Sequence, residues 1–211
     1  VRDNFSWGLG WDLRKKSDTG KNWLKMGKSL TQKSAHELCW EKFNPDSKES
    51  QEVPRIRIAL EWIKKLDSKI VLDIGCGPAT LARFVKKDLP KVRIDGLDIS
   101  SAALEFAKQY LDHWREANID EADIPIPDET YDAIVCLEFI EHVYDVHHAL
   151  SEIKRLLSKS GKVLISVPNL VYWRYRLQVL RGQIPHPEIA DERHLHLFNL
   201  SGLTERLFRA G

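Results

Sequence analysis

The stretch Ile70-Val71-Leu72-Asp73-Ile74-Gly75-Cys76-Gly77 decides the fold of this chain. Its run of apolar residues is typical of a central parallel strand that is covered on both faces. The glycines that follow permit a tight turn and a close approach of the backbone to a ligand. A buried strand that ends in such a loop predicts a nucleotide-like ligand at the carboxyl edge of a parallel sheet.

The residues around this loop indicate which nucleotide is bound. A dinucleotide-binding loop needs a third glycine where a helix N-terminus meets a pyrophosphate, and this chain has Thr80 there. Asp73 would repel a pyrophosphate but attract an ammonium or sulfonium group. Asp98 ends the next apolar run, about 20 residues after the loop, where an acid accepts hydrogen bonds from ribose hydroxyls. The pattern predicts an adenosine ligand that carries both cations, as S-adenosylmethionine does.

Apolar periodicity along the rest of the chain alternates between strand and helix patterns, which requires a mostly parallel sheet. Strands are predicted at residues 70–73, 92–98, 131–136 and 162–167, with a weakly marked one near residues 117–119. Helices are predicted after Pro54, around Leu81 to Val85, after Ser100, after Asp145, and at residues 170–181 with Trp173, Leu177 and Leu180 facing inward and Gly182 at the end.

Four motifs, in order, resemble those of the class I S-adenosylmethionine-dependent methyltransferases. They lie at residues 71–77, 96–100, 124–132 and 138–143. The resemblance implies an α/β fold for residues 54–211: a Rossmann-like, doubly wound, mostly parallel sheet that binds S-adenosylmethionine. It also implies that Asp73 and the loop hold the methionine part of the cofactor, Asp98 the ribose, and Asp120 with Glu121 the adenine. The implied cofactor-binding residues are Asp73, Gly75, Cys76, Gly77, Asp98, Ile99, Asp120, Glu121 and Leu137.

The resemblance raises one expectation about the sheet edge. Class I methyltransferases usually add a closing antiparallel pair of strands, whereas this sequence reaches Gly211 directly after a helical pattern. The closing hairpin is therefore expected to be absent from this chain, either because it lies beyond residue 211 or because the sheet is trimmed to about five strands. We expect the former, because an uncovered sheet edge invites aggregation.

The candidate chemistry follows the strand at residues 131–136. If the next residues are helical, Glu138, Glu141 and His142 share one face at spacings i, i+3 and i+4. His142 would then be a general base oriented by Glu141. Alternatively, the three residues would bind a divalent cation, with His194 or His196 as a further ligand. The resemblance supports such metal sites in ubiquinone-biosynthesis O-methyltransferases and small-RNA terminal 2′-O-methyltransferases. A third possibility is that these residues only shape the cofactor pocket.

Residues 1–53 are predicted to form a basic, tryptophan-containing, helical N-terminal extension and linker. Residues 1–69 carry 15 Lys and Arg against 10 Asp and Glu, whereas residues 70–211 carry 17 against 21. Interleaved tryptophans and lysines would suit an anionic or sugar-bearing substrate, or tryptophans that anchor a cap on the core. Nucleic acid is an unexpected partner because no nucleic-acid motif accompanies the charge.

Composition also bears on the compartment. The three cysteines, Cys39, Cys76 and Cys136, show neither metal-ligand spacing nor an even-numbered disulfide framework. No apolar run approaches the roughly 20 residues that span a membrane, and the N-terminus lacks a signal-peptide pattern. A cytoplasmic protein is predicted.

The sequence therefore predicts an S-adenosylmethionine-dependent methyltransferase with a small-molecule acceptor. Residues 168–199 resemble methyltransferases found with glycan, lipid-head-group and other metabolite pathways, so O- or N-methylation of a glycan, lipid precursor or other metabolite is expected. Two alternatives remain open: a metal-assisted RNA 2′-O-methyltransferase and a non-catalytic cofactor-binding module. Neither the acceptor atom nor the oligomeric state follows from these patterns.

Overall fold

Five parallel strands form one sheet in the order β3-β2-β1-β4-β5. The structure, a computed structural model, describes residues 33, 34, 37, 54–121, 123–183 and 193–211. All of these belong to one compact unit, Gln32–Gly211. The predicted linker at residues 44–53 and the tryptophans of the extension lie outside the described residues.

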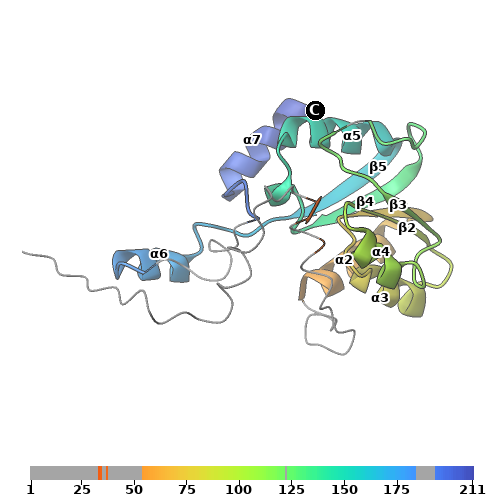
Figure 1. The fold of residues 1–211 in the computed structure, drawn as a ribbon, viewed down its shortest axis with the longest axis horizontal. Coiled ribbons are helices and arrows are strands. Elements are labelled where there is room, and N and C mark those ends of the chain that lie inside the picture. Colours follow the sequence, from red (N-terminus) through yellow and green to blue (C-terminus); the bar gives the residue numbers. More distant parts are fainter. Residues whose placement is uncertain (1–32, 35–36, 38–53, 122, 184–192) are drawn as a thin grey trace, which may run out of the picture. The chain divides into compact units, whose positions relative to one another are not determined.

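The elements alternate along the chain as the periodicity predicts (Figure 1). The strands are β1 (Ile70–Ile74), β2 (Arg93–Asp98), β3 (His113–Glu116), β4 (Tyr131–Leu137) and β5 (Leu157–Ser166). The helices are α2 (Pro54–Leu66), α3 (Thr80–Asp88), α4 (Ser101–Ala107), α5 (Val146–Leu156), α6 (Trp173–Leu180) and α7 (Leu200–Ala210), with a 3-10 turn, η4 (Ile140–His142), after β4.

Helices cover both faces of the sheet. Successive strand residues point to opposite faces, so Val71 packs in the core beneath α2, α3 and α4, whereas Leu72 packs in the core beneath α5. Residues of β4 divide in the same way: Val135 lies in the first core and Ile134 in the second. This arrangement confirms the predicted doubly wound α/β fold, and it explains why β1 reads as a continuous apolar run.

Two predicted helix caps are confirmed. The Ser100 hydroxyl accepts a hydrogen bond from Ala103 N at 3.1 Å, and the Asp145 carboxylate accepts one from His148 N at 3.0 Å. Each side chain satisfies a backbone N–H group that the first turn of a helix leaves without a partner. The Asp145 hydrogen bond and the nearby backbone N–H groups also lower the pKa of that carboxyl group.

The third and fifth strands differ from the prediction. Strand β3 is His113–Glu116, ahead of the expected residues 117–119, because it is an exposed edge strand without apolar alternation. Ile119, which suggested the later position, is buried in the core from a loop. Strand β5 begins at Leu157, five residues before the expected start, and its pairing with β4 shifts register between Tyr131 and Ala133.

The predicted helix at residues 170–181 is shorter and faces solvent. In the described part of the chain, α6 buries none of its residues, and Leu180 is 81% exposed, so the expected inward face is wrong. Its end is as predicted: Gly182 has φ +71°, and Gln183 N donates to Gln178 O at 2.9 Å. This geometry is a Schellman C-cap.

The sheet edge agrees with the expected absence of a closing hairpin. Every strand pair in the described ranges is parallel, and β5 forms one edge of the sheet. None of the described helices is both long and apolar enough to cross a membrane.

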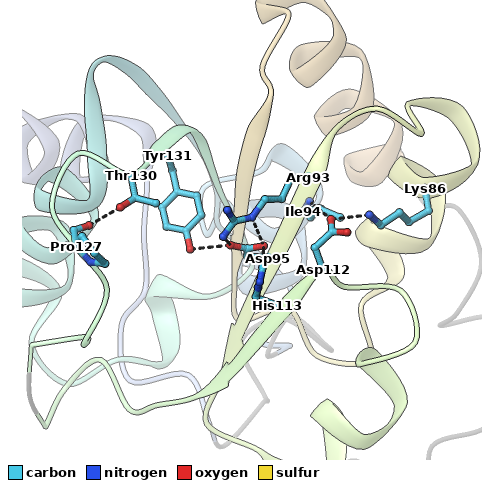
Figure 2. Close-up of polar contacts among 9 residues, drawn as sticks. All are labelled: Lys86, Arg93, Ile94, Asp95, Asp112, His113, Pro127, Thr130 and Tyr131. Carbon is cyan, nitrogen blue, oxygen red and sulfur yellow. Dashed lines mark hydrogen bonds and ion pairs between the residues drawn. The ribbon is translucent and has the colours of Figure 1, made fainter.

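A buried carboxylate within β2 ties three strands together. Figure 2 shows Asp95 of β2 accepting hydrogen bonds from Arg93, from His113 Nδ1 of β3 and from the Tyr131 hydroxyl of β4, the last two at 3.1 Å. The Asp95 side chain is only 4% exposed. Burial and the neighbouring Asp95 charge raise the pKa of Tyr131, which keeps its hydroxyl protonated as a donor. Asp95 therefore bridges strands that do not all pair directly.

We expect Asp95→Ala to lower the free energy of unfolding by about 2–3 kcal/mol, because it leaves the buried Tyr131 hydroxyl without its acceptor. Urea unfolding monitored by circular dichroism measures this change. Glu205→Ala is the matched control, since it removes only the exposed Arg209 pair of α7 and should cost less than about 1 kcal/mol. Equal effects of the two substitutions would show that the Asp95 network does not stabilise the sheet.

Candidate functional site

The glycine loop after β1 needs its first glycine for two reasons. Gly75 has φ +71°, a conformation that residues with a Cβ rarely adopt. A Cβ on Gly75 would also lie 2.5 Å from Cδ2 of Phe139. The backbone N–H groups of Gly75 and Cys76 both donate to Leu97 O, at 2.8 and 3.1 Å, and fix the loop against the end of β2.

Two buried carboxylates flank this loop. Asp73 at the end of β1 is 4% exposed, and no described residue donates a hydrogen bond to its carboxylate. Asp98 at the end of β2 is 7% exposed, and its two oxygens accept from Gly77 N and Ser100 N, both at 2.8 Å. Removing two negative charges from water is costly unless a cation compensates them.

The pKa values of Asp73 and Asp98 reflect the free energy needed to bury their charges. Burial, reinforced by the Asp98 charge, raises the pKa of Asp73 to about 8. Burial also raises the pKa of Asp98, although the hydrogen bonds from Ser100, Gly77 and Ile99 oppose the shift. A cationic ligand would therefore stabilise the ionised form of Asp73 more than that of Asp98.

A cavity of about 570 Å³ opens at the carboxyl ends of the central strands. This volume falls within the range of small-molecule sites. Seven of the nine predicted cofactor-binding residues line it, namely Asp73, Gly75, Cys76, Gly77, Asp98, Ile99 and Leu137. Cys76 is buried, and burial raises the pKa of its thiol well above the usual range, which makes it a packing residue and not a nucleophile.

Asp120 and Glu121, the other two predicted cofactor residues, are not among the described residues that line the cavity. The Asp120 carboxylate accepts from Tyr144 N and Asp145 N at 3.0 and 2.9 Å, and Glu121 accepts from Asn118 Nδ2 at 3.0 Å. The cavity is lined instead by Asn118 and by its neighbours Ala117 and Ile119. The part of the cavity wall that follows β3 therefore lies slightly earlier in the sequence than the residues predicted to contact adenine, and the adenine contacts stay a prediction.

The predicted helical face of Glu138, Glu141 and His142 does not form. Glu138 has φ +53°, and only Ile140–His142 make a turn of 3-10 helix. The Glu138 carboxylate instead accepts a hydrogen bond from Ser166 Oγ at 2.7 Å. The expected metal set that includes Glu138 is thus replaced by another grouping.

His142 is held by the segment that begins at Arg193. Its Nδ1 lies 3.1 Å from Arg193 O, and because a carbonyl only accepts, Nδ1 carries the proton. In the neutral form of such a ring Nε2 is the basic nitrogen, and His142 lines the cavity. The N–H groups of Leu195 and His196 donate to Glu141 O at 2.8 and 3.1 Å, which anchors the same segment to η4.

Glu141, His142 and His194 form the one described group whose arrangement suits a metal ion. Their ligand atoms lie within 4.8 Å of one another, and the two imidazole rings have centroids 4.8 Å apart. Two imidazoles and one carboxylate suit zinc or iron better than magnesium, which prefers oxygen ligands. His196 lies elsewhere: its Nε2 is 3.3 Å from Tyr144 O.

Arg55 in the first turn of α2 also lines the cavity, and the sequence patterns above did not single it out. A zwitterionic methionine tail needs a donor for its carboxylate as well as an acid for its ammonium group. The N–H groups of Gly75, Cys76 and Gly77 are already used within the protein, so the loop itself offers few donors. No sequence signal singles out Arg55, because Arg57, Lys64, Lys65 and Lys69 are cations that lie nearer to β1 in the sequence.

A family comparison identifies this site. The methyltransferase domain family matches residues 48–211 of the chain. The chain belongs to this family. S-adenosylmethionine is accordingly the cofactor, and the residues present fit it, because two buried acids and a glycine loop line one cavity.

Related proteins act in quinone pathways according to their names. The demethylmenaquinone methyltransferase of Thermotoga maritima is 31% identical over 106 residues, which cover 50% of this chain and 46% of that protein. The ubiquinone biosynthesis O-methyltransferase of Dechloromonas aromatica is 30% identical over 139 residues, 62% of this chain and 58% of that protein. The methyltransferase chain thus spans about half the length of the curated relatives it matches.

Solved structures share the fold. A SAM-dependent methyltransferase from Archaeoglobus fulgidus superposes with a TM-score of 0.57 at 18% identity, covering 74% of this chain and 68% of that one. The [4+2]-cyclase SpnF superposes with a TM-score of 0.62 at 17% identity, covering 87% and 74%. Because SpnF is described as a cyclase, the fold by itself does not specify which reaction the site performs.

The raised pKa of Asp73 predicts a pH-dependent stability of the protein without cofactor. A carboxyl group whose folded pKa is about 8, against an ordinary value of 3.8, takes up a proton on folding between these limits. Its stabilising contribution is complete below pH 3.8 and is lost as the pH rises to about 8. Asp73→Asn removes this titration, so the variant should gain stability over the wild type as the pH rises.

Urea unfolding of wild type and Asp73→Asn at a series of pH values between 4 and 9 measures this difference. Taking the difference cancels the titration of all groups that the two proteins share. A constant difference across the series would mean that Asp73 titrates normally in the folded protein.

Proposed function

We propose that the chain transfers a methyl group from S-adenosylmethionine to an oxygen or nitrogen atom of a small-molecule acceptor, with His142 as the general base. The observation that carries this proposal is the contact between His142 Nδ1 and Arg193 O. It selects the tautomer whose Nε2 accepts a proton, in a side chain that lines the same cavity as Asp73 and Asp98.

The residues of the chain divide the work within the cavity. When bound, S-adenosylmethionine supplies an electrophilic methyl group on its sulfonium. Asp73 and Asp98 hold the donor by charge and hydrogen bonding, and His142 takes the proton that the acceptor loses. Apolar side chains on the same wall, Phe139 and Val143, exclude water near the reacting atoms. Positioning is the main contribution expected of this site, because methyl transfer needs no covalent help from the protein.

The relatives support a small-molecule acceptor. Two of them are named for demethylmenaquinone and ubiquinone biosynthesis. The charge of the chain agrees with this class, because residues 70–211 carry 17 Lys and Arg against 21 Asp and Glu and would repel a nucleic acid. The acceptor is therefore a metabolite, with a glycan, lipid precursor or quinone precursor as the classes to test.

Metal-assisted transfer is a second candidate, because Glu141, His142 and His194 group together. A cation bound there would lower the pKa of an acceptor hydroxyl. It would also occupy the His142 lone pair, so the two mechanisms exclude each other at that atom. Calorimetric titration with Zn²⁺ and Mg²⁺, and methyl transfer with and without a chelator, distinguish them. Metal-dependent transfer to RNA but not to metabolites would instead favour the RNA 2′-O-methyltransferase.

We expect His142→Gln to lower turnover by about 10²-fold or more while the affinity for S-adenosylhomocysteine stays within about twofold, because only proton removal is lost. Turnover is measured with isotope-labelled S-adenosylmethionine and a metabolite extract, followed by mass spectrometry of labelled products. His196→Gln is the matched control, since its ring contacts the Tyr144 carbonyl and not the cavity.

Two outcomes would contradict this proposal. Unchanged turnover in His142→Gln would remove the residue from the reaction. A wild-type protein that binds S-adenosylhomocysteine but labels nothing in extracts would support the non-catalytic cofactor-binding module instead.

A further inference from the structure

Two residues of the N-terminal extension contact the sheet beside the cofactor cavity. Lys33 and Glu37 are both helical and lie four residues apart in the sequence. The Lys33 ammonium group pairs with the Glu116 carboxylate at the end of β3. Glu37 contacts the start of α4, which follows β2.

Glu37 makes an unusually complete set of hydrogen bonds. Its carboxylate accepts from Ser101 N at 2.8 Å, Ala102 N at 3.1 Å, and the hydroxyl groups of Ser100 and Ser101, both at 3.0 Å. The first N–H groups of a helix have no partner within the helix and favour a negative charge. Burial raises the pKa of Glu37, but these hydrogen bonds outweigh burial and lower it, so the carboxylate is charged.

The contacted segments are those that line the cavity on its nucleoside side. Asp98 and Ile99 immediately precede the turn that Glu37 holds, and Ser100 N donates to the Asp98 carboxylate at 2.8 Å. Ala117, Asn118 and Ile119 immediately follow Glu116, the partner of Lys33. Lys33 and Glu37 therefore connect the ends of two neighbouring strands, each of which continues into the cavity wall.

We propose that Lys33 and Glu37 are positioning residues for the cofactor, which hold the β2–α4 turn and the end of β3 at the spacing that the nucleoside requires. The extension thereby acts as a part of the cofactor site without touching the reacting atoms. This inference rests on the placement of the ribose at Asp98.

The test is calorimetric binding of two ligands to the full chain. 5′-Methylthioadenosine contains the nucleoside but lacks the amino-acid tail, whereas S-adenosylhomocysteine contains both. We expect Glu37→Ala to weaken the binding of both ligands by the same factor, roughly tenfold, since the loss of a helix cap is of that size. Glu105→Ala, which removes only the exposed Lys108 pair from the same helix, should stay within about twofold.

Kinetics separates positioning from a general loss of structure. Glu37→Ala should raise the KM for S-adenosylmethionine by a similar factor while turnover at saturating cofactor stays within about twofold. Glu37→Gln keeps an acceptor oxygen, folds with less perturbation, and should show an intermediate loss of roughly threefold. If Glu37→Ala does not fold, the measurements on Glu37→Gln alone decide the result.

Several outcomes would overturn the inference. Unchanged affinity in both Glu37 variants, or a loss confined to S-adenosylhomocysteine, would show that Glu37 does not position the nucleoside side. Asp98→Ala provides the separate check on the ribose placement. If Asp98→Ala leaves the affinity for 5′-methylthioadenosine unchanged, the placement itself is wrong, whatever Glu37 does.

Discussion

The burial of two acidic side chains at the ends of adjacent strands is the constraint on which the rest of this structure depends. Asp73 and Asp98 come together because parallel strands place their carboxyl ends on one edge of the sheet. Neither acid has a protein cation beside it that the described contacts show, and burial raises the pKa of both. Ionising these buried acids is therefore unfavourable until a cationic ligand binds beside them. The strand ends that bring the two acids together thus contribute to the affinity for the methyl donor.

The other side of the cavity is built with the opposite character. His142 and His194 supply imidazole groups, and the backbone carbonyl of Arg193 accepts a hydrogen bond from Nδ1 of the proposed base. Backbone hydrogen bonds from the Leu195–His196 segment to Glu141 hold this side together. In the proposed mechanism Asp73 binds the cationic donor and His142 accepts the proton, and the protein contributes mainly by positioning donor and acceptor.

The sequence was most informative where local pattern and tertiary environment agree. The β1 run, the glycine loop and the caps at Ser100 and Asp145 follow from burial and turn chemistry within a few residues. Strand β3 was misplaced because an exposed edge strand has no apolar alternation. The helical face at Glu138 failed because a positive φ at that residue, which no local pattern shows, precedes a single 3-10 turn. Glu37 reaches its partners through long-range contacts, so only the structure could bring it to the site. The sequence proposed His194 or His196 beside His142, and only the structure distinguishes the two.

The titration of Asp73 in the presence and absence of ligand tests the central claim most directly. Carboxyl carbon chemical shifts of ¹³C-labelled aspartate report the pKa of this group in the folded protein. We predict a pKa near 8 for the protein alone, and a fall to the ordinary range or below once S-adenosylhomocysteine places its ammonium group against the carboxylate. A pKa that is ordinary in both states, or one that stays near 8 after saturation with ligand, would contradict the view that Asp73 recognises the cationic tail of the cofactor.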